Sequence, residues 1–77
     1  MKKRTKIDAR GAQCPGPLME LIAGLRNLGK GDEVEILSND KGSLTDIPIW
    51  AKKAGHAIEK IEEIQDHYSI VVEKVKT

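Results

Sequence analysis

Five apolar residues spaced three or four positions apart constrain the fold of this 77-residue chain more than any other feature. They are Leu18, Leu21, Ile22, Leu25 and Leu28. This spacing places all five on one face of a helix that extends from about Pro15 or Pro17 to Leu28. The segment Gly29-Lys30-Gly31-Asp32 follows, and we expect it to end the helix.

A strand is predicted on each side of this helix. Thr5–Ala9 alternates polar and less polar residues and is followed by Gly11. Glu33–Leu37 alternates cleanly and precedes a polar loop over 38–43. A strand, a helix and a second strand in succession imply a right-handed crossover that makes the two strands parallel.

A second helix is predicted after the polar loop. Its apolar residues keep helical spacing; they are Leu44, Ile47, Trp50, Ala51 and Ala54. Pro48 would clash inside a long helix, so we expect the regular helix to begin within one turn of it, with Thr45 or Asp46 as the N-cap. Gly55 stands where a C-terminal cap belongs. Trp50 is interpreted as a core residue, with a surface contact as the alternative.

Residues 57–65 fit either a helix or a strand. Ile58, Ile61 and Ile64 have helical spacing, whereas the segment 68–73 that follows is β-rich. A strand would pair locally with that segment through a hairpin over 65–67, and local pairing is the commoner outcome. We therefore favour a strand, in a single domain over 1–77 with the order β-α-β-α-β-β. The predicted fold is a two-layer α/β (α+β) sandwich with two helices on one face of a mixed four-stranded sheet.

Composition excludes several classes of function. Lys plus Arg number 13 and Asp plus Glu number 12, so a net charge of +1 gives no general attraction to nucleic acid or membranes. A single cysteine excludes an internal disulfide and multi-cysteine metal motifs, and it indicates a reducing compartment. We find no signal peptide and no long apolar run, and we expect a soluble cytoplasmic protein without a metal.

The only cysteine, Cys14, directly precedes Pro15-Gly16-Pro17. Proline is tolerated in the first turn of a helix, so this pattern predicts that Cys14 lies at a helix N-terminus. The positive end of the helix dipole there lowers the pKa of a thiol. Arg10 is the only nearby cation, and no His, Lys or second Cys stands in the motif as a base. The pattern favours a charged, exposed sulfur that exchanges a group over stand-alone turnover, with a buried structural cysteine as the alternative.

Two separated segments carry a family resemblance. The first runs from Asp8 to Leu18 with the sequence DARGAQCPGPL, and the second runs from Asp40 to Trp50 and is followed by Gly55-His56. Together they resemble the two signatures of the TusA (SirA-like) family of small sulfur-carrier proteins. The resemblance implies the two-layer sandwich above and makes 57–65 a strand. It also implies that Cys14 accepts sulfane sulfur as a transient persulfide, without a further cofactor, and passes it to a partner protein.

The resemblance also assigns supporting residues. Those of the Cys14 motif are Asp8, Gly11, Pro15, Gly16 and Pro17. Those expected to contact partners are Arg10, Met19, Asp40 and Asp46. For Met19, we favour a half-buried helix residue over the partner contact. The implied donor is a cysteine desulfurase or rhodanese-like protein, and the implied acceptor is a further relay protein.

The chain departs from this family pattern at three places. Gly16 stands where tRNA-thiolation members commonly have an acidic residue, and Thr45 stands where they often have a basic one. No second cysteine occurs near Trp50, so we expect the persulfide to leave only by attack from another molecule.

Two other functions remain open at this point. A regulatory or RNA-binding module of the same fold would use the basic residues near the N-terminus, which are Lys2, Lys3, Arg4 and Lys6. Only 3% of residues are aromatic, which argues against stacking on single strands. A metal site would combine Cys14 with His56 and His67, whose spacing matches no standard zinc motif. The two histidines are interpreted instead as a helix-end residue and a hairpin-turn residue.

Overall fold

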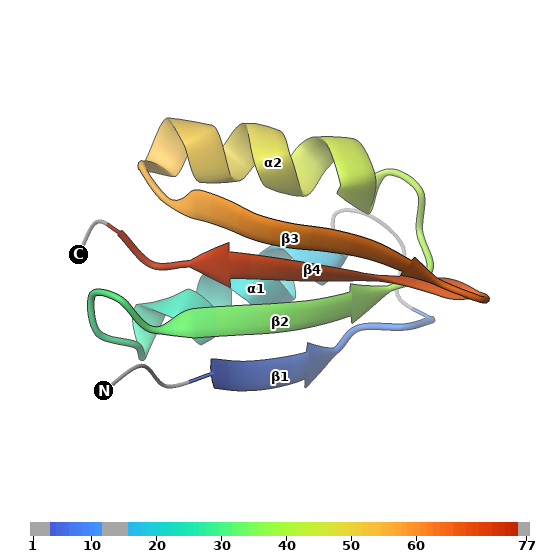
Figure 1. Ribbon diagram of the computed structural model, residues 1–77, viewed down its shortest axis with the longest axis horizontal. Coiled ribbons are helices and arrows are strands. Elements are labelled where there is room, and N and C mark those ends of the chain that lie inside the picture. Colours follow the sequence, from blue (N-terminus) through green and yellow to red (C-terminus); the bar gives the residue numbers. More distant parts are fainter. Residues whose placement is uncertain (1–3, 12–15, 76–77) are drawn as a thin grey trace.

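The described residues form helices and strands in the order that the sequence predicts. A computed structural model describes residues 4–11 and 16–75. Along the chain, the elements are β1 (Arg4–Asp8), α1 (Gly16–Arg26), β2 (Glu33–Ser38), α2 (Ser43–Ala54), β3 (Ala57–Ile64) and β4 (His67–Glu73), as labelled in Figure 1. The ambiguous segment 57–65 is therefore a strand up to Ile64, and a turn at Gln65 and Asp66 leads into β4.

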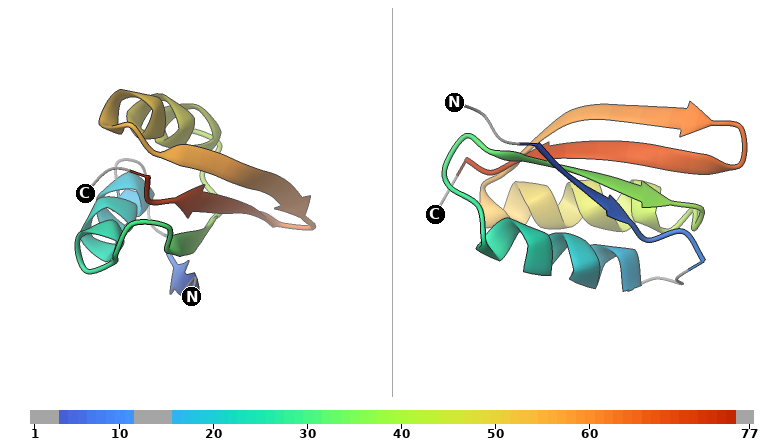
Figure 2. Two further views of the ribbon diagram at one scale, coloured as in Figure 1. Left: turned by 60° about the vertical axis from the view of Figure 1, so that its left-hand side comes forward. Right: turned by 90° about the horizontal axis from the view of Figure 1, so that it is seen from below.

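The strands form one mixed sheet in the spatial order β1-β2-β4-β3. β1 and β2 are parallel and are connected through α1, as a crossover requires. β4 is antiparallel to both of its neighbours, β2 and β3. Both helices cover the same face of the sheet, as the right-hand view of Figure 2 shows. The predicted two-layer sandwich is thereby confirmed.

The core lies between the two central strands and the helices. Val34 and Ile36 of β2 stand opposite Val72 and Ile70 of β4, and all four are fully buried. The helices add further buried residues to this cluster, namely Leu21, Leu25, Ile47 and Ala51. Burying one side chain of this size contributes about 1.5–3 kcal/mol to the free energy of folding. The residues that the central strands and the helices bury together therefore hold the two layers in contact.

The carboxyl end of α1 lies two residues before the predicted one. The helix ends at Arg26 because the last turn changes its bonding: the Leu28 amide donates to the Leu25 carbonyl at 3.2 Å. The Lys74 Nζ atom then donates to the Leu25 carbonyl at 2.7 Å and to the Leu28 carbonyl at 2.9 Å. A residue distant in sequence thus bonds one carbonyl of the last turn of α1 and one just beyond it, which periodicity alone could not show.

The amino end of α2 differs from the expected one. We expected Thr45 or Asp46 as the N-cap, but the helix begins at Ser43 with Gly42 in the N-cap position. The amides of Thr45 and Asp46 both donate to the Gly42 carbonyl, at 3.1 and 2.9 Å. A complete turn is therefore closed before Pro48, and the missing proline N–H removes only one later bond.

The carboxyl end of α2 is as predicted. Gly55 is the C-cap and has φ 85°, a left-handed conformation that glycine adopts without strain. The amide of His56 donates to the Ala51 carbonyl at 2.8 Å, so the backbone of His56 does bond a free helix carbonyl.

Both helices are short, with 11 residues in α1 and 12 in α2. Neither of these described helices has the length and apolar character required to cross a bilayer.

Candidate functional site

The carboxyl ends of β1 and β2 and the amino ends of α1 and α2 meet at one edge of the molecule, on the right in Figure 1. β1 and β2 end together because Asp8 pairs with Leu37, and the Ala9 amide extends the pairing by donating to the Leu37 carbonyl at 2.8 Å. Cys14 and Pro15 belong to the segment 12–15, which lies outside the described residues. Gly11 and Gly16, on either side of that segment, are described at this edge.

An ion pair fixes the chain as it leaves β1. The Arg10 guanidinium donates to both carboxylate oxygens of Asp8, at 2.9 and 2.8 Å, and the Arg10 amide adds a bond of 3.1 Å. These bonds from Arg10 hold the pKa of Asp8 well below its usual range, and Asp8 in turn raises the pKa of Arg10. The cation that the sequence places nearest to Cys14 is therefore neutralised locally by Asp8.

Gly11 connects the first motif segment to the residue directly before the second segment. Its φ is 89°, which only glycine adopts at little cost, and its amide donates to the Asn39 side-chain oxygen at 3.0 Å. Asn39 follows directly after β2, so this bond ties the loop after β1 to the loop after β2. The sequence interpretation did not include Asn39, although an amide side chain at the carboxyl end of a strand is a usable signal.

Asp40 shapes the loop that leads into α2. Its carboxylate accepts the Gly42 amide at 3.0 Å, and its own amide donates to the Ser38 hydroxyl at 3.1 Å. The Ser38 and Ser43 hydroxyls bond each other at 2.9 Å, and both serines are buried. Asp40 thus has a structural role in the turn, and contact with a partner stays a prediction. Ser38 and Ser43 were not predicted, since nothing in their spacing shows that they meet.

The start of α1 contains both buried and exposed side chains. It contains no acidic side chain that would offset the positive end of the helix. Pro17 is fully buried, so it anchors the helix start as well as tolerating it. Met19 is 59% exposed, and the favoured interpretation of it as a half-buried helix residue is therefore wrong. An exposed methionine beside the Cys14 motif remains available for a partner contact.

Asp46 lies in the first turn of α2, where it is half-buried. Because the N-cap of this helix makes no side-chain hydrogen bond, a carboxylate here complements the positive helix end. This structural contribution does not depend on the partner contact that the sequence suggests.

The turn between β3 and β4 also reaches this edge. The His67 ring bonds Asp66 at 3.0 Å, which lowers the pKa of Asp66, and the charge of Asp66 further raises the pKa of Arg10. His56 lies at the other end of β3, about 26 Å away along an eight-residue strand at 3.3 Å per residue. The proposed metal site of Cys14 with both histidines is therefore wrong, because the two histidines do not meet.

Arg4, which the RNA-binding alternative would use, is paired with an acidic residue in the structure. Its guanidinium donates twice to the Glu33 carboxylate, both at 3.1 Å, across β1 and β2. Of the other basic residues in that proposal, Lys2 and Lys3 lie outside the described residues, and Lys6 is exposed on β1.

Comparison with known proteins gives consistent matches over almost the whole chain. Residues 5–74 match the family model described as sulfurtransferase TusA. A protein of Archaeoglobus fulgidus named "Putative sulfur carrier protein" is 50% identical over 70 residues, which cover 91% of this chain and 96% of that protein. The Escherichia coli "Putative sulfur carrier protein TsuB" is 39% identical, with 90% and 93% covered.

A solved structure agrees with the fold. The crystal structure of a SirA-like protein from Desulfitobacterium hafniense superposes with a TM-score of 0.80 at 25% identity, covering 99% of this chain and 100% of that one. The family match spans both motif segments and the whole sheet. The chain therefore belongs to the TusA family, whose model is described as a sulfurtransferase.

Proposed function

We propose that this protein is a sulfur carrier that accepts sulfane sulfur as a persulfide on Cys14 and passes it to a partner protein. Family membership and relatives named as sulfur carriers support the carrier role. The observation that supports Cys14 as the acceptor is its position two residues before Gly16, the first residue of a helix without an acidic first turn.

The helix start suits an anionic sulfur. A thiolate or persulfide near the amino end of a helix gains about 0.3–1 kcal/mol from the dipole and from N–H groups that lack intrahelical partners. Pro17 has no N–H, so the Gly16 and Leu18 amides are the donors of the first turn on either side of it. Because Arg10 is already paired with Asp8, the helix end rather than a free cation supplies the favourable field.

Each transfer is an exchange between sulfurs. The Cys14 thiolate attacks the outer sulfur of a donor persulfide, a new sulfur–sulfur bond forms on Cys14, and the donor cysteine leaves as a thiolate. A thiolate of the acceptor then attacks the outer sulfur on Cys14, and Cys14 leaves as a thiolate. The number of sulfur–sulfur bonds is constant, so neither step needs an external oxidant or reductant.

The partners are therefore proteins that present a persulfide or a reactive thiolate. Exchange requires both sulfurs to be accessible, and the described residues around the motif provide an exposed surface with Met19 and the Asp8–Arg10 pair. A cysteine desulfurase or rhodanese-like donor and a relay-protein acceptor fit this chemistry.

The experiment that tests this function is loading followed by site mapping. The protein is incubated with a cysteine desulfurase and cysteine, or with a low-molecular persulfide, and its intact mass is measured before and after reductant. We expect a gain of one sulfur that reductant removes and that peptide mapping locates on Cys14. Cys14→Ser, the matched control, should fold normally and gain nothing. No adduct from either donor, with a Cys14 that resists alkylation in the folded protein, would overturn the proposal.

A further inference from the structure

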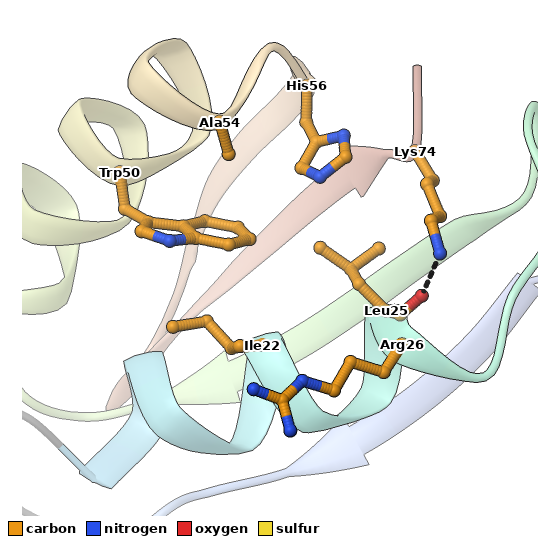
Figure 3. Close-up of a pocket in the computed structure, with 7 residues that line it drawn as sticks. All are labelled: Ile22, Leu25, Arg26, Trp50, Ala54, His56 and Lys74. Atoms are coloured by element: carbon orange, nitrogen blue, oxygen red, sulfur yellow. Dashed lines mark hydrogen bonds between the residues drawn. The ribbon is translucent and has the colours of Figure 1, made fainter. Parts of the chain in front are cut away.

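A concave surface lies between the carboxyl-terminal halves of the two helices. It is a pocket of about 240 Å³. The described residues that line it come from α1, α2 and the chain next to β3 and β4, and Figure 3 shows them: Ile22, Leu25, Arg26, Trp50, Ala54, His56 and Lys74.

The pocket has an apolar floor and an aromatic wall. Ile22 and Leu25 of α1 contribute aliphatic surface, and the indole of Trp50 on α2 faces them across the opening (Figure 3). Ala54 lies on the same side as Trp50, four residues further along α2. The rings of Trp50 and His56 are 5.5 Å apart and inclined at 47°. The Val75 amide donates to Nδ1 of His56 at 3.2 Å, which fixes the orientation of the imidazole ring. This arrangement suits a small apolar body.

The polar groups at the rim are basic. No acidic residue occurs among the described residues that line the pocket. Lys74 uses two of its three N–H donors on the carbonyls of Leu25 and Leu28, so one donor is left. In the part of the chain that the structure describes, no hydrogen bond or ion pair engages the guanidinium of Arg26, which extends along the pocket below Ile22 (Figure 3). A guanidinium can bind a carboxylate through two parallel hydrogen bonds.

We propose that this pocket binds a small organic anion, an aryl or branched alkyl carboxylate whose apolar body lies against Trp50 and Ile22 and whose carboxylate binds Arg26. The pocket volume of about 240 Å³ suits a single ring with a short acidic chain. It is smaller than the pockets of about 300–1,000 Å³ that hold drug-sized ligands. The pocket lies at the carboxyl-terminal half of α1, at the other end of this helix from Gly16, so its occupancy does not depend on sulfur transfer.

Trp50, the only tryptophan of the chain, reports directly on this site. Phenylacetate and its neutral analogue phenylacetamide are titrated into the full chain while Trp50 emission and amide NMR shifts are followed. We expect phenylacetate to change both signals saturably and to bind at least about tenfold more tightly than the amide, since a charge-assisted hydrogen bond contributes about 1.5–3 kcal/mol. Shifts should centre on the residues that line the pocket.

Variants locate the anion and the apolar body. Arg26→Gln should reduce phenylacetate affinity to that of the amide without unfolding the protein, because Arg26 is exposed. Lys41→Gln is the matched control. It removes an exposed cation just before the amino end of α2, away from the pocket, and this variant should bind phenylacetate normally. Ala54→Leu should fill the pocket and abolish binding of both probes.

Three outcomes would overturn the proposal. These are no saturable change at tens of millimolar phenylacetate, equal affinity for phenylacetate and the amide, and full binding by Arg26→Gln. Equal affinity would identify a general apolar surface, of the kind that a side chain of a partner protein covers.

Discussion

At the scale of single residues, the described polar groups at the edge of the site form hydrogen bonds with one another. Arg10 is bound to Asp8, Gly11 to Asn39, and Asp40 to the backbone of Gly42. The charges next to the motif are thus balanced before any partner arrives. This balance can be disturbed in either direction by single substitutions.

Changing the charge of the Asp8–Arg10 pair should change the reactivity of Cys14 with opposite signs. Asp8→Asn removes the carboxylate paired with Arg10, a cation four residues before the thiol. It should speed alkylation of Cys14 near neutral pH, because more of the thiol is ionised. Arg10→Gln, which leaves the negative charge of Asp8 unpaired, should slow alkylation of Cys14. The rate of iodoacetamide modification measures both, and raised salt should reduce both effects. Equal rates in the two variants would show that the pair does not influence the sulfur.

Two glycines with positive φ provide a matched pair of variants. Gly11→Ala and Gly31→Ala each force alanine into a left-handed conformation, at φ 89° and 93°, with open space around the added methyl group. Each should cost about 1–2 kcal/mol in urea unfolding. Only Gly11→Ala should also impair sulfur loading, because only Gly11 is bonded to the loop beside the site. Loss of loading in both variants would assign the defect to stability alone.

At the scale of elements, α2 depends on a buried polar contact at its start. Ser38 at the end of β2 and Ser43 at the beginning of α2 share a hydrogen bond of 2.9 Å in a buried position. The bond connects the end of the strand directly to the start of the helix.

Removing either hydroxyl should destabilise the protein. Ser38→Ala and Ser43→Ala should each cost about 1–3 kcal/mol, because each leaves a buried hydroxyl or amide without its partner. The double variant should cost less than the sum of the two, as expected for residues in contact. Denaturant unfolding of all four proteins gives the coupling energy. Strict additivity would contradict a shared hydrogen bond.

At the scale of the whole molecule, His56 links the end of α2 to the chain after β4. Burial, and to a smaller extent the charge of Lys74, lower the pKa of His56 below its usual value near 6.5. The neutral ring is the form that accepts the Val75 amide.

Stability should therefore decrease as pH falls below about 6.5, where the unfolded state takes up a proton that the folded state resists. This loss of stability should level off below the folded-state pKa of His56. It should resume below pH 3.8, the usual pKa of an aspartate, because the folded-state pKa values of Asp8 and Asp66 are also lowered. His56→Gln should remove the first decrease in urea midpoint and keep the second. Persistence of the first decrease in this variant would exclude His56 as its origin.

Most of the fold could be predicted from local patterns, and most of the site's geometry could not. The periodicity of Leu18 to Leu28 predicts a helix and the alternation of Glu33 to Leu37 predicts a strand, and the element order follows from such patterns. The Lys74 bonds to the end of α1 and the Asn39 bond to Gly11 depend on contacts distant in sequence. Such contacts exist only after the sheet has formed, and no local spacing encodes them.

The central claim, that Cys14 carries transferable sulfur, is tested most directly by following intact mass through loading and discharge. The protein is loaded by a persulfide donor, separated from it, and mixed with a thiol acceptor in the absence of other reductants. The account predicts one added sulfur on Cys14 that then appears on the acceptor in equal amount. Sulfur that loads on Cys14→Ser to the same extent, or that stays on the protein when the acceptor is added, would contradict it.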